Sequence, residues 1–195
     1  MKKLGISLTF LALVAFTSCK DKKADAEKIV VEELEKTLEI EKKSTTISVS
    51  LILESKSEST ATGKVSFTET DGIVEMDAKV SGLTPGIHAI HIHEKADCSS
   101  PDGKSSGGHW NPMKVQHGKW GNVDGYHKGD IGNLVADEAG FGTISMKTDQ
   151  WCIGCGDENK DILGKAIIVH QGVDDFTTQP TGAAGGRVSC GGIIE

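Results

Sequence analysis

Six of the seven histidines in this 195-residue chain lie in or beside two stretches, 94–130 and 171–186, that lack the alternating pattern of a strand. They are His91, His93, His109, His117, His127 and His170. Imidazole nitrogens bind zinc and copper, and Asp130 adds a carboxylate to the same group. Unrelated surface histidines would not be expected to gather in this way in a chain otherwise poor in histidine. The pattern therefore predicts a metal centre with enough ligands for two ions.

The pair His91 and His93 shows what the spacing contributes. Residues two apart on a strand project from the same face, so both rings can point at one ion. The pair alone is weak evidence, because paired histidines also occur on ordinary strand surfaces. His88 lies three residues before His91 and should face the other way, so we expect it to have a structural role.

Short strands have to position these histidines. From Thr46 on, apolar residues such as Ile47 and Val49 recur at every second position, which indicates a half-buried strand. Similar runs, separated by Gly, Pro, Asp or Ser, occur at 63–69, 73–80, 86–93, 131–136, 141–147, 164–170 and 187–193. Eight such runs predict an all-β, antiparallel fold that is closed or sandwiched. The two long stretches without alternation are expected to be functional loops.

Five motifs together resemble copper/zinc superoxide dismutase. They lie at 86–94 (GIHAIHIHE), 108–112 (GHWNP), 127–133 (HKGDIGN), 168–175 (IVHQGVDD) and 186–191 (GRVSCG). The resemblance covers about residues 46–195, and the motifs in combination are specific. It implies an eight-stranded antiparallel Greek-key β-sandwich or barrel with two long functional loops. It also implies an enzyme that converts superoxide to oxygen and hydrogen peroxide by redox cycling of copper, with zinc as a structural and tuning metal.

The same resemblance assigns the metal ligands. Copper, one ion per chain, would be held by His91, His93, His109 and His170, and zinc, one ion per chain, by His109, His117, His127 and Asp130. His109 would bridge the ions as an imidazolate, a form that two adjacent cations make accessible. Asp174 would accept hydrogen bonds from His91 and His117 and so link the two ligand sets. The alternatives are an Asx turn at Asp174 and the same bridging role for Asp175.

Arg187 stands where the family has a substrate-guiding arginine. Beside the open copper position it would attract and orient the superoxide anion by a charge-assisted hydrogen bond, and with His109 it completes the expected catalytic residues. The alternative for Arg187 is a structural ion pair. Because the chain is acidic, with a formal charge of −7, fast turnover also requires a local positive field. The candidates by loop position are Lys104, Lys114, Lys119 and Lys128.

Four cysteines follow the N-terminal region, and four cysteines allow three pairings. The resemblance implies a disulfide between Cys98 and Cys190. The insertion at 148–161, which carries Cys152 and Cys155, has no counterpart that we recognise in the family. Its Cys-x-x-Cys is open to three interpretations: a redox pair, half a metal site or a small local disulfide. We favour the local disulfide, because no second Cys pair and no redox-domain context accompany it.

The N-terminal region predicts export. Lys2 and Lys3 precede an apolar run at 4–16 that is too short to cross a bilayer, which indicates a signal peptide over residues 1–18. Together with Cys19 it resembles a bacterial lipoprotein leader. This implies a lipid anchor on Cys19 and a location in the periplasm or cell envelope. A soluble secreted protein with a free or paired Cys19 is the alternative.

Charge and composition limit the partners. Removal of residues 1–18 takes away two lysines and lowers the formal charge from −7 to −9, which argues against nucleic acid binding. Residues 19–45 are rich in charge and predict a tether ahead of a domain at 46–195; a partner-binding helix is the alternative. The expected partners are superoxide and, through the lipid anchor only, a membrane. A homodimer is compatible with the sequence, which does not reveal the oligomeric state.

Two other functions are open from the sequence. A non-catalytic extracytoplasmic copper- or zinc-binding protein would need neither Arg187 nor a bridging His109. An interaction protein would use the tether and the insertion around Cys152, but it would have no use for the full ligand set. The complete set of ligands together with Arg187 favours catalysis.

Overall fold

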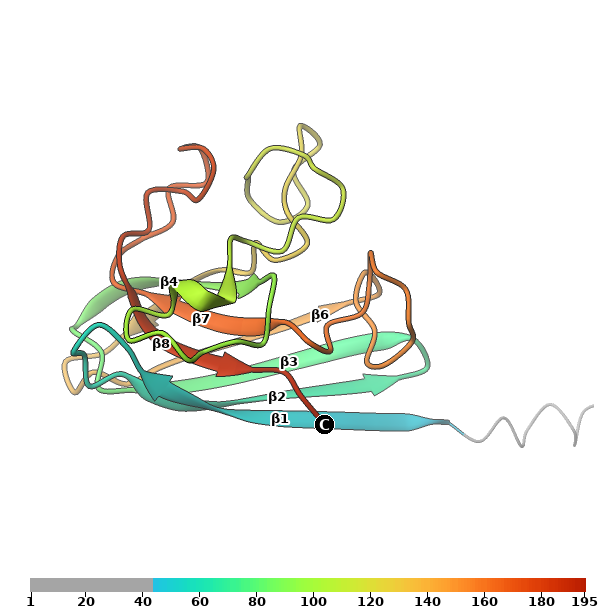
Figure 1. Ribbon diagram of the computed structural model, residues 1–195, viewed down its shortest axis with the longest axis horizontal. Helices are drawn as coiled ribbons and strands as arrows, with labels where there is room; N and C mark the ends of the chain where they lie inside the picture. Colours follow the sequence, from blue (N-terminus) through green and yellow to red (C-terminus); the bar gives the residue numbers. More distant parts are fainter. Residues whose placement is uncertain (1–43) are drawn as a thin grey trace, which may run out of the picture. The chain divides into compact units, whose positions relative to one another are not determined.

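Eight antiparallel strands close into a barrel over residues 44–195, the part of the chain that the computed structural model describes (Figure 1). They are β1 (Thr46–Ser55), β2 (Thr62–Thr70), β3 (Ile73–Ser81), β4 (Gly86–His93), β5 (Gly132–Ala136), β6 (Gly142–Thr148), β7 (Ala166–His170) and β8 (Arg187–Gly192). The order around the barrel is β1-β2-β3-β6-β5-β4-β7-β8, so the expected all-β Greek-key fold is confirmed. The expected signal peptide, the lipidated Cys19 and nearly all of the tether lie outside the described residues.

Alternation along the strands fills the barrel interior. In β3, for example, Val74, Met76, Ala78 and Val80 are buried, and the residues between them are not. Strands β4 and β7 differ, because their central residues are buried on both faces. A strand covered on both faces has no polar side, which explains why Ile167, Ile168 and Val169 form an unbroken apolar run. Side chains on the outer faces of β4 and β7 are therefore covered by other parts of the chain and can belong to a buried site.

Hairpin turns fix the register of the sheet. Thr70 pairs with Ile73, so Asp71 and Gly72 form a two-residue turn between β2 and β3. Both have positive φ, 51° and 80°, as the tight hairpin turn that matches the strand twist requires. Between β7 and β8 the register shifts at Val169/His170, so that His170 faces Arg187. This irregularity places an arginine directly opposite a predicted copper ligand.

Three long connections join the strands: β4–β5, β6–β7 and β7–β8. The β4–β5 connection contains a short 3-10 helix, η1 (Lys104–Ser106), and is joined to β8 by the disulfide Cys98–Cys190. The β6–β7 connection contains the second disulfide, Cys152–Cys155. In Figure 1 the β4–β5 and β7–β8 connections rise from the same side, over β4 and β7. Within residues 44–195, no helix is long and apolar enough to cross a membrane.

Candidate metal centre

Backbone pairing brings the histidines of three segments together. His91 pairs with Ile168 in the β4–β7 ladder, and His109 pairs with His93 in an isolated bridge. The loop continues along the same edge, because Trp110 donates its N–H to Ile92 O (2.8 Å) and Ile92 donates its own to Gly129 O (2.9 Å). A Cβ on Gly129 would lie 2.1 Å from Ile92 O, so only glycine allows this approach. The loop ligands are thus attached to the strand ligands through the main chain.

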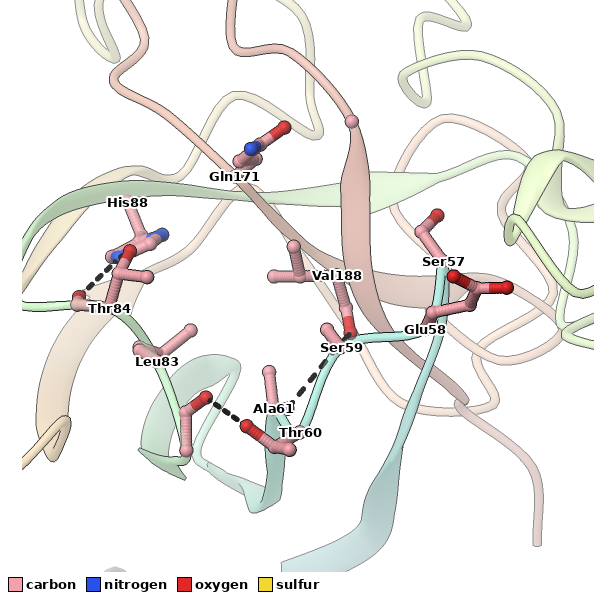
Figure 2. A pocket seen from close by; sticks show the side chains of 12 residues that line it. Ser57, Glu58, Ser59, Thr60, Ala61, Leu83, Thr84, His88, Gln171 and Val188 are labelled. Atoms are coloured by element: carbon pink, nitrogen blue, oxygen red, sulfur yellow. Dashed lines mark hydrogen bonds between the residues drawn. The ribbon is translucent and has the colours of Figure 1, made fainter.

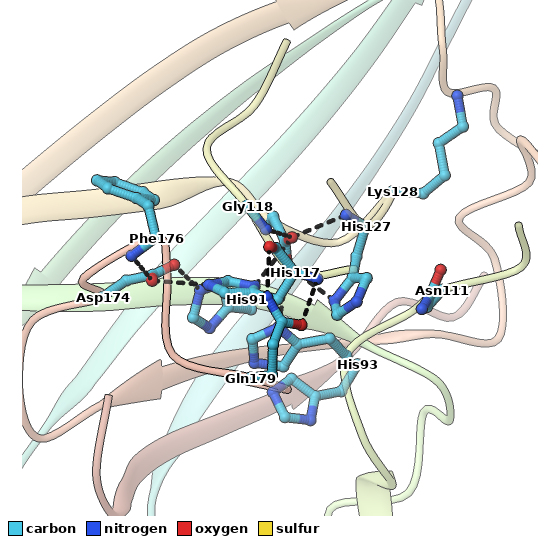
Figure 3. Close-up of polar contacts among 12 residues, drawn as sticks. His91, His93, Asn111, His117, Gly118, His127, Lys128, Asp174, Phe176 and Gln179 are labelled. Carbon is cyan, nitrogen blue, oxygen red and sulfur yellow. Dashed lines mark hydrogen bonds and ion pairs between the residues drawn. The ribbon is translucent and has the colours of Figure 1, made fainter. Parts of the chain in front are cut away.

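The side chains form two clusters that share one residue. Figure 3 shows four of the imidazoles, those of His91, His93, His117 and His127, gathered beside Asp174. In each cluster the four ligand atoms lie within 4.8 Å of one another, and all the residues are buried. The first cluster is His91, His93, His109 and His170, and the second is His109, His117, His127 and Asp130. The structure therefore brings together every residue of the two expected ligand sets, with His109 in both.

Hydrogen bonds occupy one nitrogen of several imidazole rings and so determine which nitrogen is left to bind an ion. Asp174 accepts one from His91 Nε2 (2.8 Å) and one from His117 Nε2 (2.8 Å). Gly107 O accepts one from His93 Nδ1 (2.9 Å), and His127 Nε2 lies 3.2 Å from Val115 O. Four buried ring nitrogens make no hydrogen bond of good geometry: His91 Nδ1, His109 Nε2, His117 Nδ1 and His127 Nδ1. The last two lie within 3.2 Å of an Asp130 oxygen, as an ion pair would. Unpartnered buried nitrogens are costly, and ones that converge in a cluster fit metal ions.

Asp130 lies at the centre of the second cluster. Its carboxylate oxygens lie 2.9 Å from His109 Nδ1, 3.0 Å from His117 Nδ1 and 3.2 Å from His127 Nδ1. The backbone N–H groups of His127 (2.7 Å) and Gly118 (3.2 Å) also donate to it. Burial opposes ionisation of Asp130, but the surrounding imidazole nitrogens and backbone N–H groups outweigh it and hold its pKa well below the ordinary range. The carboxylate is therefore ionised, as a zinc ligand must be.

Most of the histidines are kept neutral, which is the form that binds a metal ion. Burial lowers the pKa of His91, and it lowers the pKa values of His93 and His170 well below the ordinary value. Burial likewise lowers the pKa of His109 to about 4. His117 differs from these four: burial lowers its pKa, but its contacts with Asp130 and Asp174 outweigh this and raise it to about 9.

Asp174 combines two of the roles considered from the sequence. It bridges His91 and His117, and its Oδ1 also accepts the N–H of Phe176 (2.8 Å), as in an Asx turn. Asp175 instead accepts the N–H groups of Thr177 and Thr178 (2.8 Å each) and does not take the bridging position. The position of Asp174 follows from β5, since Asn133 exchanges two hydrogen bonds with its backbone.

Two residues that support the site were not identified from the sequence. Gly182, at φ 65°, lies against Asp174, and a Cβ there would be 1.8 Å from Asp174 Oδ1. Gln179 accepts the N–H of His117 (2.8 Å) and donates to its carbonyl (2.9 Å). A glycine and a glutamine in a loop without periodicity carry no sequence signal for such contacts, and the partner of Gln179 lies 62 residues away.

Arg187 is half-buried beside the first cluster. Its guanidinium donates to Gly103 O (2.8 Å), Ser106 Oγ (3.0 Å) and Gly107 O (2.8 Å). The residue lines a cavity of about 270 Å³ together with His93 and His170. Lys104 also lines this cavity, whereas Lys128 donates to Gln150 Oε1 (2.6 Å). Of the four lysines considered from the sequence, Lys104 is the one beside Arg187.

His88 lies in a neighbouring cavity of about 310 Å³ (Figure 2). Its Nε2 lies 2.8 Å from Thr84 O, and its Nδ1 lies 2.8 Å from His170 O. The ring thus connects the β3–β4 connection to the backbone of a cluster residue, in agreement with a structural role. Ser57 and Gly186 line both cavities.

Comparisons with known proteins agree with this geometry. The family model for copper/zinc superoxide dismutase (SODC) matches residues 61–193. A Cu-Zn superoxide dismutase of Caulobacter vibrioides is 40% identical over 135 residues, covering 67% of this chain and 77% of that protein. Two solved structures are similar. A double mutant of a SOD-like protein from Bacillus subtilis has a TM-score of 0.66 and 34% identity, covering 75% of this chain and 97% of that one. The clock protein EA4 has a TM-score of 0.65 and 35% identity, covering 75% of this chain and 94% of that one.

Proposed function

The chain belongs to the copper/zinc superoxide dismutase family, and from this premise we propose that it converts two superoxide ions and two protons to oxygen and hydrogen peroxide. The observation that carries the proposal is the pair of ligand clusters that share His109, with Arg187 lining the cavity at the first cluster. Copper, when bound, would take one electron from a first superoxide and give it to a second, and zinc would not change oxidation state.

Each cluster would hold a different metal ion. Copper would be held by His91, His93, His109 and His170, and zinc by His109, His117, His127 and Asp130. Burial keeps the copper-side rings neutral and ready to bind. Asp174 orients one ring of each cluster, so a change in one cluster is transmitted to the other through a single carboxylate.

Arg187 would guide the substrate. Three of its five N–H donors are engaged by Gly103, Ser106 and Gly107, which leaves two for an anion in the cavity. Those three bonds fix the guanidinium in place, so little side-chain entropy is lost when superoxide arrives. The positive charge in a confined cavity would attract a small anion into contact with the first cluster.

A second candidate function is metal binding without catalysis. Two similar structures favour considering it, because one is described as SOD-like and the other as a clock protein. Storage or transfer of metal would need the ligand clusters, but it would give no role to an arginine held at the cavity beside His93 and His170. This difference makes Arg187 the residue that separates the two functions.

The test measures superoxide consumption and bound metal together. We expect the chain loaded with copper and zinc to hold one ion of each and to consume superoxide rapidly. His109→Ala should lose both activity and metal, because it belongs to both clusters. Arg187→Ala should keep both metals and lose activity by about tenfold or more, and Arg187→Lys should recover part of it. Stoichiometric metal without turnover in the unmutated chain would leave a metal-binding protein.

We also propose that the chain is exported and lipid-anchored. The leader at 1–18, the Cys19 that follows it and the charged stretch at 19–45 support this arrangement, since β1 begins at Thr46. The anchor would hold the domain at 46–195 at a membrane surface. Cys19→Ala should move the protein from the membrane fraction to the soluble fraction. An unmutated protein found only in the soluble fraction would contradict the anchor.

A further inference from the structure

The β6–β7 connection, which includes the insertion without a recognised counterpart, contacts the loop that carries the second cluster. Gln150 Oε1 accepts hydrogen bonds from Tyr126 OH (2.9 Å) and from Lys128 Nζ (2.6 Å). Its Nε2 donates to Tyr126 OH (2.7 Å). Tyr126 and Lys128 are the residues immediately before and after His127. One glutamine side chain therefore holds both neighbours of a predicted zinc ligand.

Trp151 makes the next contact with the same loop. It is 1% exposed, and its indole N–H donates to Lys128 O (2.9 Å). Its ring packs edge-on against Trp120, with 5.2 Å between ring centroids. Trp120 in turn packs on Tyr126 at 5.0 Å. The indole thus supports the loop at two points, at Trp120 between His117 and His127 and at Lys128 directly after His127.

The insertion itself is fixed to the barrel. Trp151 packs edge-on against Phe67 of β2 at 6.2 Å, and Ile153 donates its N–H to Glu69 Oε2 (2.7 Å). The Cys152–Cys155 disulfide closes the turn that follows Trp151. The carboxylate of Asp161 accepts the N–H groups of Gly154 (2.9 Å), Gly156 (2.9 Å) and Leu163 (3.0 Å). Gln150 and Trp151 therefore project from a braced element.

The two clusters differ in how much support they need. Three ligands of the first cluster, His91, His93 and His170, belong to paired strands, and the barrel holds them. His117 and His127 belong to the stretch 110–131 of the β4–β5 connection, which has no strand or helix, so their placement depends on side-chain contacts. Figure 3 shows Lys128 directed away from the imidazoles, and its Nζ donates to Gln150 Oε1.

We propose that Gln150 and Trp151 are positioning residues for the zinc half of the site, a role that rests on the proposed function above. They hold Tyr126 and Lys128 on either side of His127, and through Trp120 they support the segment that follows His117. The insertion around Cys152 and Cys155 is thereby a brace that sets how tightly zinc is held, without touching the copper ligands of the strands.

The test measures release of each metal from the chain loaded with copper and zinc. Gln150→Leu and Trp151→Phe should each release zinc to a chelator about tenfold faster, the lower end for residues that orient metal ligands. Copper release should stay unchanged. With cobalt in place of zinc, both variants should also change the visible absorption spectrum, which reports the geometry around the ion. Gln150→Glu keeps the acceptor for Lys128 and Tyr126 and should restore slow release.

Val80→Ala is the matched control for a general loss of stability. Val80 is fully buried in β3, where it pairs with Gly142, six residues from the Val74–Thr148 pair that leads into the brace. It should leave the ratio of zinc to copper release unchanged. Equal zinc release from Gln150→Leu and the unmutated chain would overturn the proposal, as would an equal rise in the ratio of zinc to copper release in Val80→Ala. An unmutated chain that binds no zinc would instead overturn the proposed function.

Discussion

Apart from the shared His109, Asp174 is the residue that connects the two ligand clusters. Its two oxygens accept hydrogen bonds from His91 and His117, one ring of each cluster. Burial opposes its ionisation, but the hydrogen bonds from His117 and His91 outweigh this and keep its pKa below the ordinary range. Gly182 lies against the carboxylate and leaves no room for a Cβ. The ionised carboxylate therefore fixes the orientation of both rings at once.

Asp174→Asn should weaken both metal sites. An amide offers one acceptor where the carboxylate offers two, so one of the two rings loses the partner that orients it. We expect the affinity for zinc and copper to fall by about 10–100-fold, as measured by competition with a chelator. Asp175→Asn is the matched control, because Asp175 accepts only from Thr177 and Thr178. Equal metal affinities in the two variants would refute the bridging role.

The buried histidines predict that the metal-free protein loses stability in mild acid. Burial lowers the pKa of His109 to about 4 and those of His93 and His170 well below the ordinary 6.5, so the folded chain takes up fewer protons than the unfolded chain as the pH falls from 7 to 5. The unfolded chain protonates them below pH 6.5, so acid favours unfolding. Each ring that stays neutral costs about 2 kcal/mol between pH 6.5 and 5. Urea denaturation at pH 7 and pH 5 measures the difference.

The other titrating groups do not cancel this loss. His117 has a raised pKa of about 9, so its stabilising contribution is complete below pH 6.5 and is lost only as the pH rises through about 9. Asp130 and Asp174 have lowered pKa values, so their contribution begins to be lost only below about pH 4. A metal-free chain that is equally stable at pH 7 and pH 5 would show that the buried rings are protonated in the fold.

At the scale of the element, the strands could be predicted from alternation. The expected runs 73–80 and 86–93 correspond to β3 (Ile73–Ser81) and β4 (Gly86–His93). The expected run 164–170 is longer than β7 (Ala166–His170), because Gly164 and Lys165 belong to the preceding turn. The alternation of apolar and polar residues indicates which side chains face the barrel interior. It does not indicate at which residue the backbone pairing of a strand begins.

The brace could not be predicted, although its residues stood out in the sequence. Trp151, Cys152 and Cys155 marked the insertion as unusual, and a local disulfide was favoured for it. Its contacts with Tyr126 and Lys128 join segments more than 20 residues apart in a region without periodicity. Periodicity predicts which face of a strand is buried, but no comparable pattern predicts which two loops meet.

The two disulfides should differ in their effect on stability. Cys98–Cys190 joins residues 92 apart, and its removal should cost about 4.5 kcal/mol by loop-closure entropy. Cys152–Cys155 joins residues three apart, and its removal should cost about 2 kcal/mol. Paired Cys→Ala variants compared by guanidinium denaturation test this. The ranking is wrong if the double variant at Cys152 and Cys155 is the less stable of the two.

At the scale of the whole molecule, net charge opposes the proposed substrate. The chain carries a formal charge of −7, so superoxide is repelled at long range. At the cavity beside Arg187, Lys104 adds a positive charge, and Asp102, 2.9 Å from Lys104 Nζ, partly cancels it. The ion pair lies at the surface, where salt screens it strongly. The balance between these two residues should therefore set the local field that superoxide meets.

Changing this balance should change the rate in both directions. Lys104→Gln should slow superoxide consumption and Asp102→Asn should raise it, each by about twofold at low salt, which is the Coulomb effect of one unit charge about 10 Å away in water. Both differences should vanish at high salt, because the Debye length falls to about 3 Å at 1 M. Lys114→Gln, an exposed position outside the lining of this cavity, should leave the rate unchanged. If the rate depended on net charge alone, Lys114→Gln and Lys104→Gln would slow superoxide consumption equally. That result would show that superoxide is attracted by the charge of the whole molecule and not by the field at the cavity.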